Sequence, residues 1–450
     1  MRPFFIFTAV LFSVIPSQAQ EPKRWTLDEC IAYAYEHNIE IKSQELSAEE
    51  KRIALSESKW GYAPDISASS SYSLSTGRVL DPTTYDFIEN QSVQGNNTSV
   101  GASISIFNGL KNLYTFKRAK LDLRSSLLAA EKTRNDIRLN ITAYYLEVLG
   151  AEETIRDAEQ VVSELKVQEE KTARKVEAHK VTTADLLQIQ SQLADAENEV
   201  LSARNTYDIA RLNLCQLLEI EDFTSFLAIA PDAEELAHTG ITDDPAAVLE
   251  AAQSLPEMKS AHVDIDLARR DLQIARTAYY PTISLSVGYG SSFSDARQKM
   301  FQNTDGTYRY EAYPFFDQYK DNASSYVSVS LNIPIFGRFS TRKNVQRQKL
   351  AVHRAEYALL TAQKQVTKEV TQALIDARTA WAKYLGAQKY VASAEEAARQ
   401  VARKYDLGAA SVTDYNTAVS TQVKARSQLI RTKYEYLLKT KIIGFYLGEL

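Results

Sequence analysis

Four segments of the chain alternate apolar and polar residues with a period of two. In the first segment, Ile66, Tyr72 and Leu74 fall on one face and serine residues occupy the other. Successive side chains of a β-strand point to opposite faces of a sheet, so the alternation predicts strands with an apolar face and a face of serine and glycine. The predicted strands are residues 65–75, 99–107, 282–290 and 326–335.

Very long helices are predicted after the second and the fourth strand, over 110–177 and 341–407, because apolar residues recur there at helical spacing. At about 1.5 Å per residue, each would be on the order of 100 Å long, far longer than the helices of globular domains. After a short turn, a further helix follows each one, over 182–218 and 412–444. The first of these carries a heptad seam of small and apolar residues, which is typical of a coiled coil.

The remaining segments are predicted to be shorter helices, loops and a connector. The first short helix begins with a capping box of Thr26 and Glu29, and the second contains Pro256. The helices are 25–60 and 244–279, the loops are 77–97 and 291–322, and the acidic connector is 219–243.

The second half of the sequence repeats the first. Ala173-Arg174-Lys175 matches Ala402-Arg403-Lys404 at an offset of 229 (402 − 173), and Ile106-Phe107 matches Ile335-Phe336 at the same offset (335 − 106). We interpret the chain as a tandem duplication, with a period far beyond that of solenoid repeats. The first repeat is 20–218 and the second is 244–450.

The N-terminus predicts export from the cytoplasm. Residues 1–19 combine Arg2, a short apolar run and Ser17-Gln18-Ala19, the pattern of a secretory signal peptide that is removed. The remainder has no apolar run of about 18 residues, so no transmembrane helix is predicted, although β-strands can also span a membrane.

Composition and motifs exclude several classes of protein. The net charge of −5 argues against a nucleic acid partner. No nucleophile elbow, P-loop or HExxH motif occurs, and the five histidines lack metal-ligand spacing, so we expect no enzyme, no metal and no cofactor. Cys30 and Cys215 lie in helical patterns and are expected to be buried apolar residues.

Alternating strands fit either a soluble sandwich or an outer-membrane barrel. The signal peptide, the strand length and the lack of a second sheet favour the barrel, in which the apolar face meets lipid. Four strands cannot close a barrel, whereas three chains would supply twelve. The long helices by themselves would favour a coiled-coil stalk, scaffold or adaptor in the periplasm, and the strand pairs reverse that preference.

The order of these elements resembles the TolC family of outer-membrane channels over almost the whole mature chain. The likeness rests on Tyr-Ala-Pro (62–64) and Tyr-Tyr-Pro (279–281) where strands begin, Ile-Phe-Asn-Gly (106–109) and Ile-Phe-Gly-Arg (335–338) where they end, and Tyr405, Gly408 and Asp414 at the second turn. The resemblance implies a homotrimer with a twelve-stranded barrel in the outer membrane and a helical barrel in the periplasm. It also implies export of drugs, small toxic molecules or proteins, together with an inner-membrane transporter and a periplasmic adaptor.

The resemblance also places the candidate sites at the two turns. Asp414 matches the first aspartate of the family's constriction, Asp185 is its counterpart in the first repeat, and Thr417 replaces the second aspartate. Stabilisation of a helix start is the alternative role of both aspartates. Tyr405 is expected either to hydrogen-bond across its hairpin or to pack in the core. The residues expected to contact the adaptor are Ala178, His179, Lys180, Val181 and Thr182, and Gly408, Ala409, Ala410 and Ser411.

Overall fold

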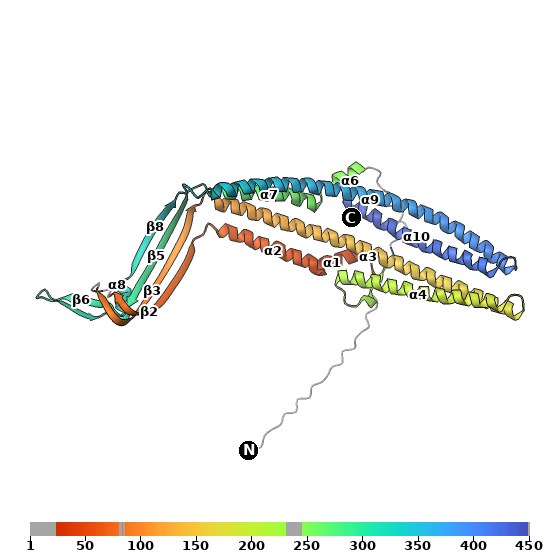
Figure 1. Ribbon diagram of the computed structural model, residues 1–450, viewed down its shortest axis with the longest axis horizontal. Helices are drawn as coiled ribbons and strands as arrows, with labels where there is room; N and C mark the ends of the chain where they lie inside the picture. The colour runs from red at the N-terminus through yellow and green to blue at the C-terminus, as the bar shows by residue number, and fades with distance from the viewer. Residues whose placement is uncertain (1–23, 81–82, 84–85, 231–244, 449–450) are drawn as a thin grey trace, which may run out of the picture. The chain divides into compact units, whose positions relative to one another are not determined.

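The computed structural model describes residues 24–80, 83, 86–230 and 245–448, and these are mainly α-helical (Figure 1). The predicted signal peptide and residues 231–243 of the predicted connector lie outside the described residues. None of the helices in the described ranges has a stretch long and apolar enough to cross a membrane.

Four long helices dominate the fold and form two series of equal lengths. Helix α3 (Lys111–Glu177) has 67 residues, as does α9 (Ser340–Asp406). Helix α4 (Thr183–Leu218) has 36 residues, as does α10 (Val412–Leu447). Both pairs are displaced by 229 positions (340 − 111 and 412 − 183), the offset found between the sequence matches.

Each of the two shorter predicted helices is broken, so the expectation of one continuous helix was wrong in both cases. Helix α1 (Leu27–His37) ends before α2 (Ile39–Trp60), because Oδ1 of Asn38 accepts hydrogen bonds from the first amides of α2. Helix α6 (Pro245–Ala252) ends before α7 (Pro256–Thr277). Proline lacks an amide hydrogen and clashes inside a helix, but it suits the first turn of a new one.

The chain divides into two compact units. Of the described residues, the helical unit takes those within 1–45, 130–256 and 363–450, and the sheet unit takes those within 46–129 and 257–362. The main core of the helical unit gathers around Tyr145 of α3, which is 2% exposed. Its hydroxyl donates to the carbonyl of Trp25, beside a small parallel pair of β1 (Arg24–Trp25) and β4 (Leu227–Ala228). A short 3-10 helix, η1 (Phe223–Ser225), precedes β4. Cys30 and Cys215 are both buried here, as expected.

The sheet unit is built around a four-stranded antiparallel sheet with strand order β2-β3-β5-β8 (Figure 1). Its strands are β2 (Asp65–Leu80), β3 (Phe87–Phe107), β5 (Thr282–Ser294) and β8 (Ser324–Asn332). The expectation of a loop over 77–97 was wrong, because β2 and β3 continue as a paired hairpin up to Leu80 and Phe87. Hydrogen bonds between the backbones of β2 and β3 join the two strands across this segment.

The second predicted loop, 291–322, is also folded. It contains the hairpin of β6 (Gln298–Gln302) and β7 (Tyr308–Ala312), followed by helix α8 (Phe315–Asp321). The aromatic residues of this segment pack on one another, with the ring of Phe315 4.9 Å from Phe293 and 4.4 Å from Tyr319.

The two faces of the sheet differ as the alternation predicts. One face presents large apolar side chains that remain mostly exposed in the single chain, among them Ile66, Val327 and Val329 at 69%, 73% and 65%. On the opposite face, the hydroxyls of Ser69 and Ser99 lie 3.0 Å apart across β2 and β3. A wide exposed apolar face is unusual for a protein surface in water and calls for a partner.

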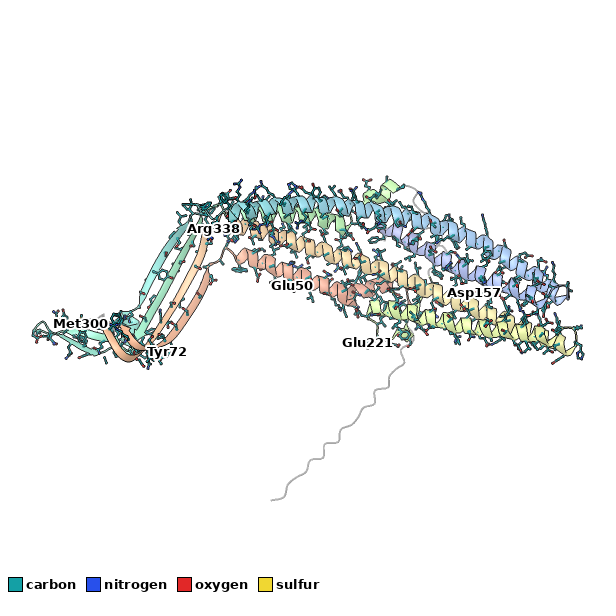
Figure 2. All side chains as sticks on the ribbon, viewed as in Figure 1. Glu50, Tyr72, Asp157, Glu221, Met300 and Arg338 are labelled. Carbon is teal, nitrogen blue, oxygen red and sulfur yellow. The ribbon has the colours of Figure 1, made fainter. Side chains whose placement is uncertain are left out.

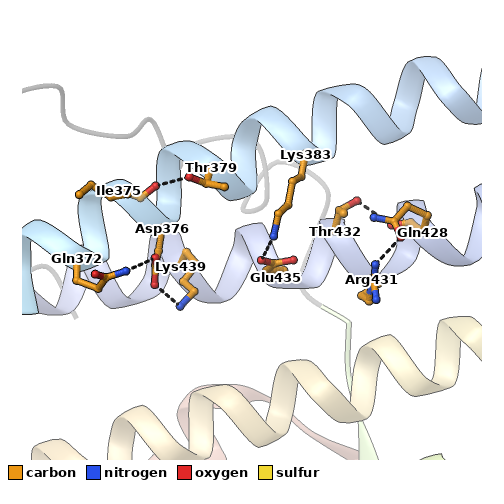
Figure 3. Close-up of polar contacts among 10 residues, drawn as sticks. All are labelled: Gln372, Ile375, Asp376, Thr379, Lys383, Gln428, Arg431, Thr432, Glu435 and Lys439. Atoms are coloured by element: carbon orange, nitrogen blue, oxygen red, sulfur yellow. Dashed lines mark hydrogen bonds and ion pairs between the residues drawn. The ribbon is translucent and has the colours of Figure 1, made fainter.

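Polar contacts join the two helices of the second hairpin. Asp376 of α9 accepts hydrogen bonds from Lys439 of α10 at 2.9 Å and from Gln372 at 2.7 Å (Figure 3). About two turns further along α9, Lys383 pairs with Glu435 of α10 at 2.9 Å. These contacts, together with the ring of Trp381 on α9 4.8 Å from that of Tyr436 on α10, fix how α10 lies against α9.

Arg426 of α10 lies among three carboxylates from two other helices. Its Nε donates to Oε1 of Glu395 on α9 at 2.9 Å. Its Nη1 lies 3.8 Å from Oδ1 of Asp157 and 3.7 Å from Oε1 of Glu164, both on α3 (Asp157 is labelled in Figure 2). Burial raises the pKa of the Asp157 carboxyl, and the charge of Arg426 opposes that rise. The guanidinium therefore ties α10 to both long helices.

We predict that Arg426→Met lowers the free energy of unfolding by about 2–4 kcal/mol, because it leaves partly buried carboxylates without a counter-charge. Arg156→Met is the matched control, since Arg156 is 64% exposed and lies 3.8 Å from a single carboxylate. Arg156→Met should lower the free energy of unfolding by at most about 1 kcal/mol. Urea unfolding of both variants in lipid or detergent measures the difference, and equal losses would contradict the assigned role of Arg426.

Candidate functional site

The two turns that follow the long helices have the same backbone geometry. His179 and Gly408 both adopt left-handed φ angles, of 56° and 72°. In each turn, the next amide donates to the carbonyl five positions back, at 2.8 Å for Lys180 and 2.7 Å for Ala409. These bonds are the Schellman motif that closes the end of a helix. Glycine adopts this conformation without strain, whereas a residue such as His179 gives up about 1 kcal/mol.

Capping boxes begin the helices after both turns. Oγ1 of Thr182 accepts from the amide of Asp185 at 3.2 Å, and Oδ2 of Asp185 accepts from the amide of Thr182 at 2.9 Å. Ser411 and Asp414 make the same two bonds, both at 3.1 Å. Each aspartate therefore satisfies amides that the first turn of a helix leaves free.

The carboxylate of Asp414 is exposed at the start of α10. Hydrogen bonds from the side chain and backbone of Ser411 hold its pKa below the usual value, so the group is ionised at neutral pH. Thr417, one turn further on, is also exposed, and its hydroxyl donates to the carbonyl of Thr413 at 2.8 Å. Of these residues, Asp414 therefore contributes a charge and Thr417 does not.

Tyr405 lies inside the hairpin rather than on its surface. Its side chain is 6% exposed, and its ring stacks on that of Tyr415 with centroids 5.3 Å apart. Ile189 of α4 and Val412 of α10 complete the cluster, which brings the ends of both hairpins together. The hydroxyl of Tyr405 is buried and makes no hydrogen bond within the described residues.

An ion pair also links the two turns. Nζ of Lys175, in the last turn of α3, lies 3.1 Å from Oδ1 of Asp406, the last residue of α9. The same ammonium lies 5.0 Å from the centre of the Tyr405 ring. Of the residues expected to contact an adaptor, Lys180, Thr182 and Ala409 are exposed, so this end of the helical unit offers a surface.

Sequence reasoning missed the polar groups buried between the hairpins. Gln168, Thr172 and Asn416 are each less than 8% exposed, and Oδ1 of Asn416 has no partner within the described residues. Residues of α3, α4 and α10 also surround a cavity of about 760 Å³ with charged walls that include Asp157 and Arg431. Nothing in the pattern distinguishes these residues from exposed polar ones, because the contacts come from distant segments. Among the described residues, no cluster of His, Cys, Asp or Glu is arranged to hold a metal.

Comparisons with known proteins agree with this architecture. Outer membrane protein TolC of Vibrio cholerae is 22% identical over 325 residues, which cover 71% of this chain and 69% of TolC. The alkaline protease secretion protein AprF of Pseudomonas aeruginosa is 23% identical over 395 residues, covering 84% of this chain and 76% of AprF. The solved structure of CusC, which forms a transmembrane channel, has the same fold with a TM-score of 0.78, at 15% identity over 94% of this chain and 91% of CusC.

The sequence model of a whole family decides the assignment. A sequence model of one protein family, described as "Outer membrane efflux protein", matches residues 31–218 and 247–448 of this chain. These residues include all four long helices and all four strands of the sheet. The chain belongs to the outer membrane efflux protein family and is an export channel of the outer membrane, with its helical part in the periplasm.

Proposed function

We propose that three copies of this chain form one export duct, with a twelve-stranded barrel in the outer membrane and a helical tube in the periplasm. Each chain, a tandem duplication, supplies four strands. The duct works with an inner-membrane transporter and a periplasmic adaptor, passes drugs, small toxic molecules or proteins, and is not an enzyme. The names of TolC and AprF, as an outer membrane protein and a protease secretion protein, support this reading.

The observation that carries the proposal is the sheet with an exposed apolar face and two open edges. Strands β2 and β8 lie at the ends of the four-stranded order, so each has one edge free for pairing. Unpaired backbone groups are not tolerated in lipid, and closure into a barrel removes them. Strand directions alternate across the sheet, so β8 of one copy meets β2 of the next in antiparallel fashion. A scaffold or adaptor in water needs no such face.

The two turns form the periplasmic end of the duct in this proposal. The adaptor docks on 178–182 and 408–411, and Asp414 lines the constriction with its counterparts from the other copies. Three carboxylates around one axis attract cations. The capping box supports this role as well as the helix start, because it fixes the carboxylate in one position.

The first prediction from this proposal concerns the faces of the strands. Ile66, Val100, Val287 and Val329 are expected to face lipid, and Ser69, Ser103, Ser286 and Ser328 to face the lumen. Val287→Arg should cost about 2–4 kcal/mol near the middle of the membrane, and Ser286→Arg far less. Unfolding from lipid vesicles measures both. Equal tolerance of arginine at these neighbouring positions would reject the barrel.

The second prediction concerns the adaptor. A photoactivatable crosslinker on Ala409→Cys should capture a periplasmic adaptor in whole cells, because this alanine is exposed at the second turn. Ala382→Cys is the matched control, an exposed alanine well inside α9, and it should capture less adaptor. Capture of outer-membrane proteins alone from Ala409 would count against docking at the turns.

The third prediction concerns the constriction. Asp414→Asn removes the charge and keeps an oxygen that can accept the hydrogen bonds of the capping box. Asp414→Asn should weaken the cation preference of single channels in planar bilayers and their block by divalent cations. Asp185→Asn makes the same change in the capping box of the other turn and serves as the comparison. An unchanged reversal potential and block in Asp414→Asn would leave the residue with its helix-start role alone.

A further inference from the structure

Helix α8 lies against the apolar face of the sheet, not against its serine face. The hydroxyl of Tyr319 contacts Thr98 of β3 at 2.9 Å, and its carbonyl accepts from the hydroxyl of Ser291 on β5 at 2.7 Å. Thr98 has the same parity along β3 as Val100, and Ser291 has the same parity along β5 as Tyr289. Side chains of equal parity share one face of a strand.

Two further residues, Gln318 and Asn322, fix α8 to the edge of β5. Beyond Gly290, β5 has no β8 partner, and its backbone groups on that side need other partners. Gln318, which is fully buried, accepts from the amide of Ser294 at 3.1 Å and donates to its carbonyl at 2.9 Å. Asn322 donates to the carbonyl of Ser292 at 2.7 Å. The helix is therefore held in place, and its position relative to the strands is defined.

Helix α8 attaches to β5 where the paired region of β5 and β8 ends, and this region has about the height of a membrane's apolar layer. Strands β5 and β8 pair over nine residues, from Thr282 to Gly290. At about 3.4 Å per residue and a tilt of about 40°, the paired region is about 23 Å tall, close to the apolar band of about 25 Å in outer-membrane barrels. Tyr289 and Tyr72, 59% and 66% exposed, lie near this end on the apolar face (Tyr72 is labelled in Figure 2). Aromatic residues are typical of the two rims of such a band.

The outer side of α8 combines an aromatic ring with a cation. Phe315 and Tyr319 face the sheet, and Phe316 and Lys320, each one position further along, share an exposed side about 100° round the helix, next to the exposed carboxylate of Asp317. Phe316 is 83% exposed and its ring meets that of Phe315 edge-on at 5.4 Å. A ring at the edge of the hydrocarbon with a lysine reaching toward the headgroups is the pattern of a membrane-interface anchor.

We propose that α8 is an interfacial helix that inserts Phe316 among the lipids of the outer leaflet and fixes the depth of the barrel in the membrane. The inference rests on the barrel of the proposed function. The apolar face of the strands continues directly into α8, which is why lipid, rather than another protein, is the occupant.

Fluorescence quenching in vesicles tests this placement. Full-length Phe316→Cys is labelled with an environment-sensitive fluorophore and reconstituted into phosphatidylcholine vesicles that contain a lipid with a nitroxide just below the headgroup. Cys30 and Cys215 are buried, and burial raises the pKa of Cys215 to about 11, so the native thiols stay unlabelled. Val329→Cys on the apolar face is the control for lipid contact. Phe301→Cys in β6 is the control for water, because Lys299 and Arg309 lie over that ring at 5.7 Å.

The nitroxide lipid should remove most of the fluorescence at positions 316 and 329, while aqueous iodide should quench mainly position 301. Quenching of 329 by the lipid, with 316 quenched only by iodide, would overturn the interfacial helix and leave the barrel intact. Absence of lipid quenching at 329 would overturn the barrel, and the inference with it.

Discussion

A β-strand in a membrane must pair both of its edges, and this requirement governs the rest of the molecule. The sheet has four strands, and β2 and β8 each have one side without a neighbour in the sheet. In the proposed duct, lipid offers no hydrogen bonds to replace those of water, so the open edges meet other copies of the chain. Once the copies of the proposed duct are joined in a ring, the long helices need only pack sideways, and small residues with polar contacts at intervals are sufficient.

Much of the fold could be predicted because its strongest signals are local. The alternation around Ile66, which predicts a strand, and the helical spacing along α3 both arise from residues that are neighbours in the sequence. The break at Asn38 was missed because a side-chain cap competes there with an otherwise good helical pattern. The hairpin beyond Gly77 was missed because the alternation of apolar and polar residues does not continue through it, whereas the pairing is made by backbone groups.

The candidate site was predictable to a smaller degree. The positions of Asp185 and Asp414 at helix starts follow from the sequence, and so do the turns before them. The surroundings of Arg426 could not be read from it, since its three carboxylates are contributed by segments up to 269 positions away (426 − 157). The burial of the Tyr405 hydroxyl could not be read from the sequence either, because it depends on which helices meet at the turn.

The equal lengths of the two helical series limit how such a protein can change over evolution. An insertion in α3 alone would carry its turn past that of α9, and Ile189 would no longer reach Tyr405 and Tyr415. Compensating insertions in both halves at once are rare events, so the helices are expected to keep a fixed length. The segments that connect paired strands do not have to match each other in length in this way. The strand entries Tyr62-Ala63-Pro64 and Tyr279-Tyr280-Pro281 are offset by 217 (279 − 62), and the later matches by 229, so the second half is 12 residues longer in the segment between its paired strands (229 − 217).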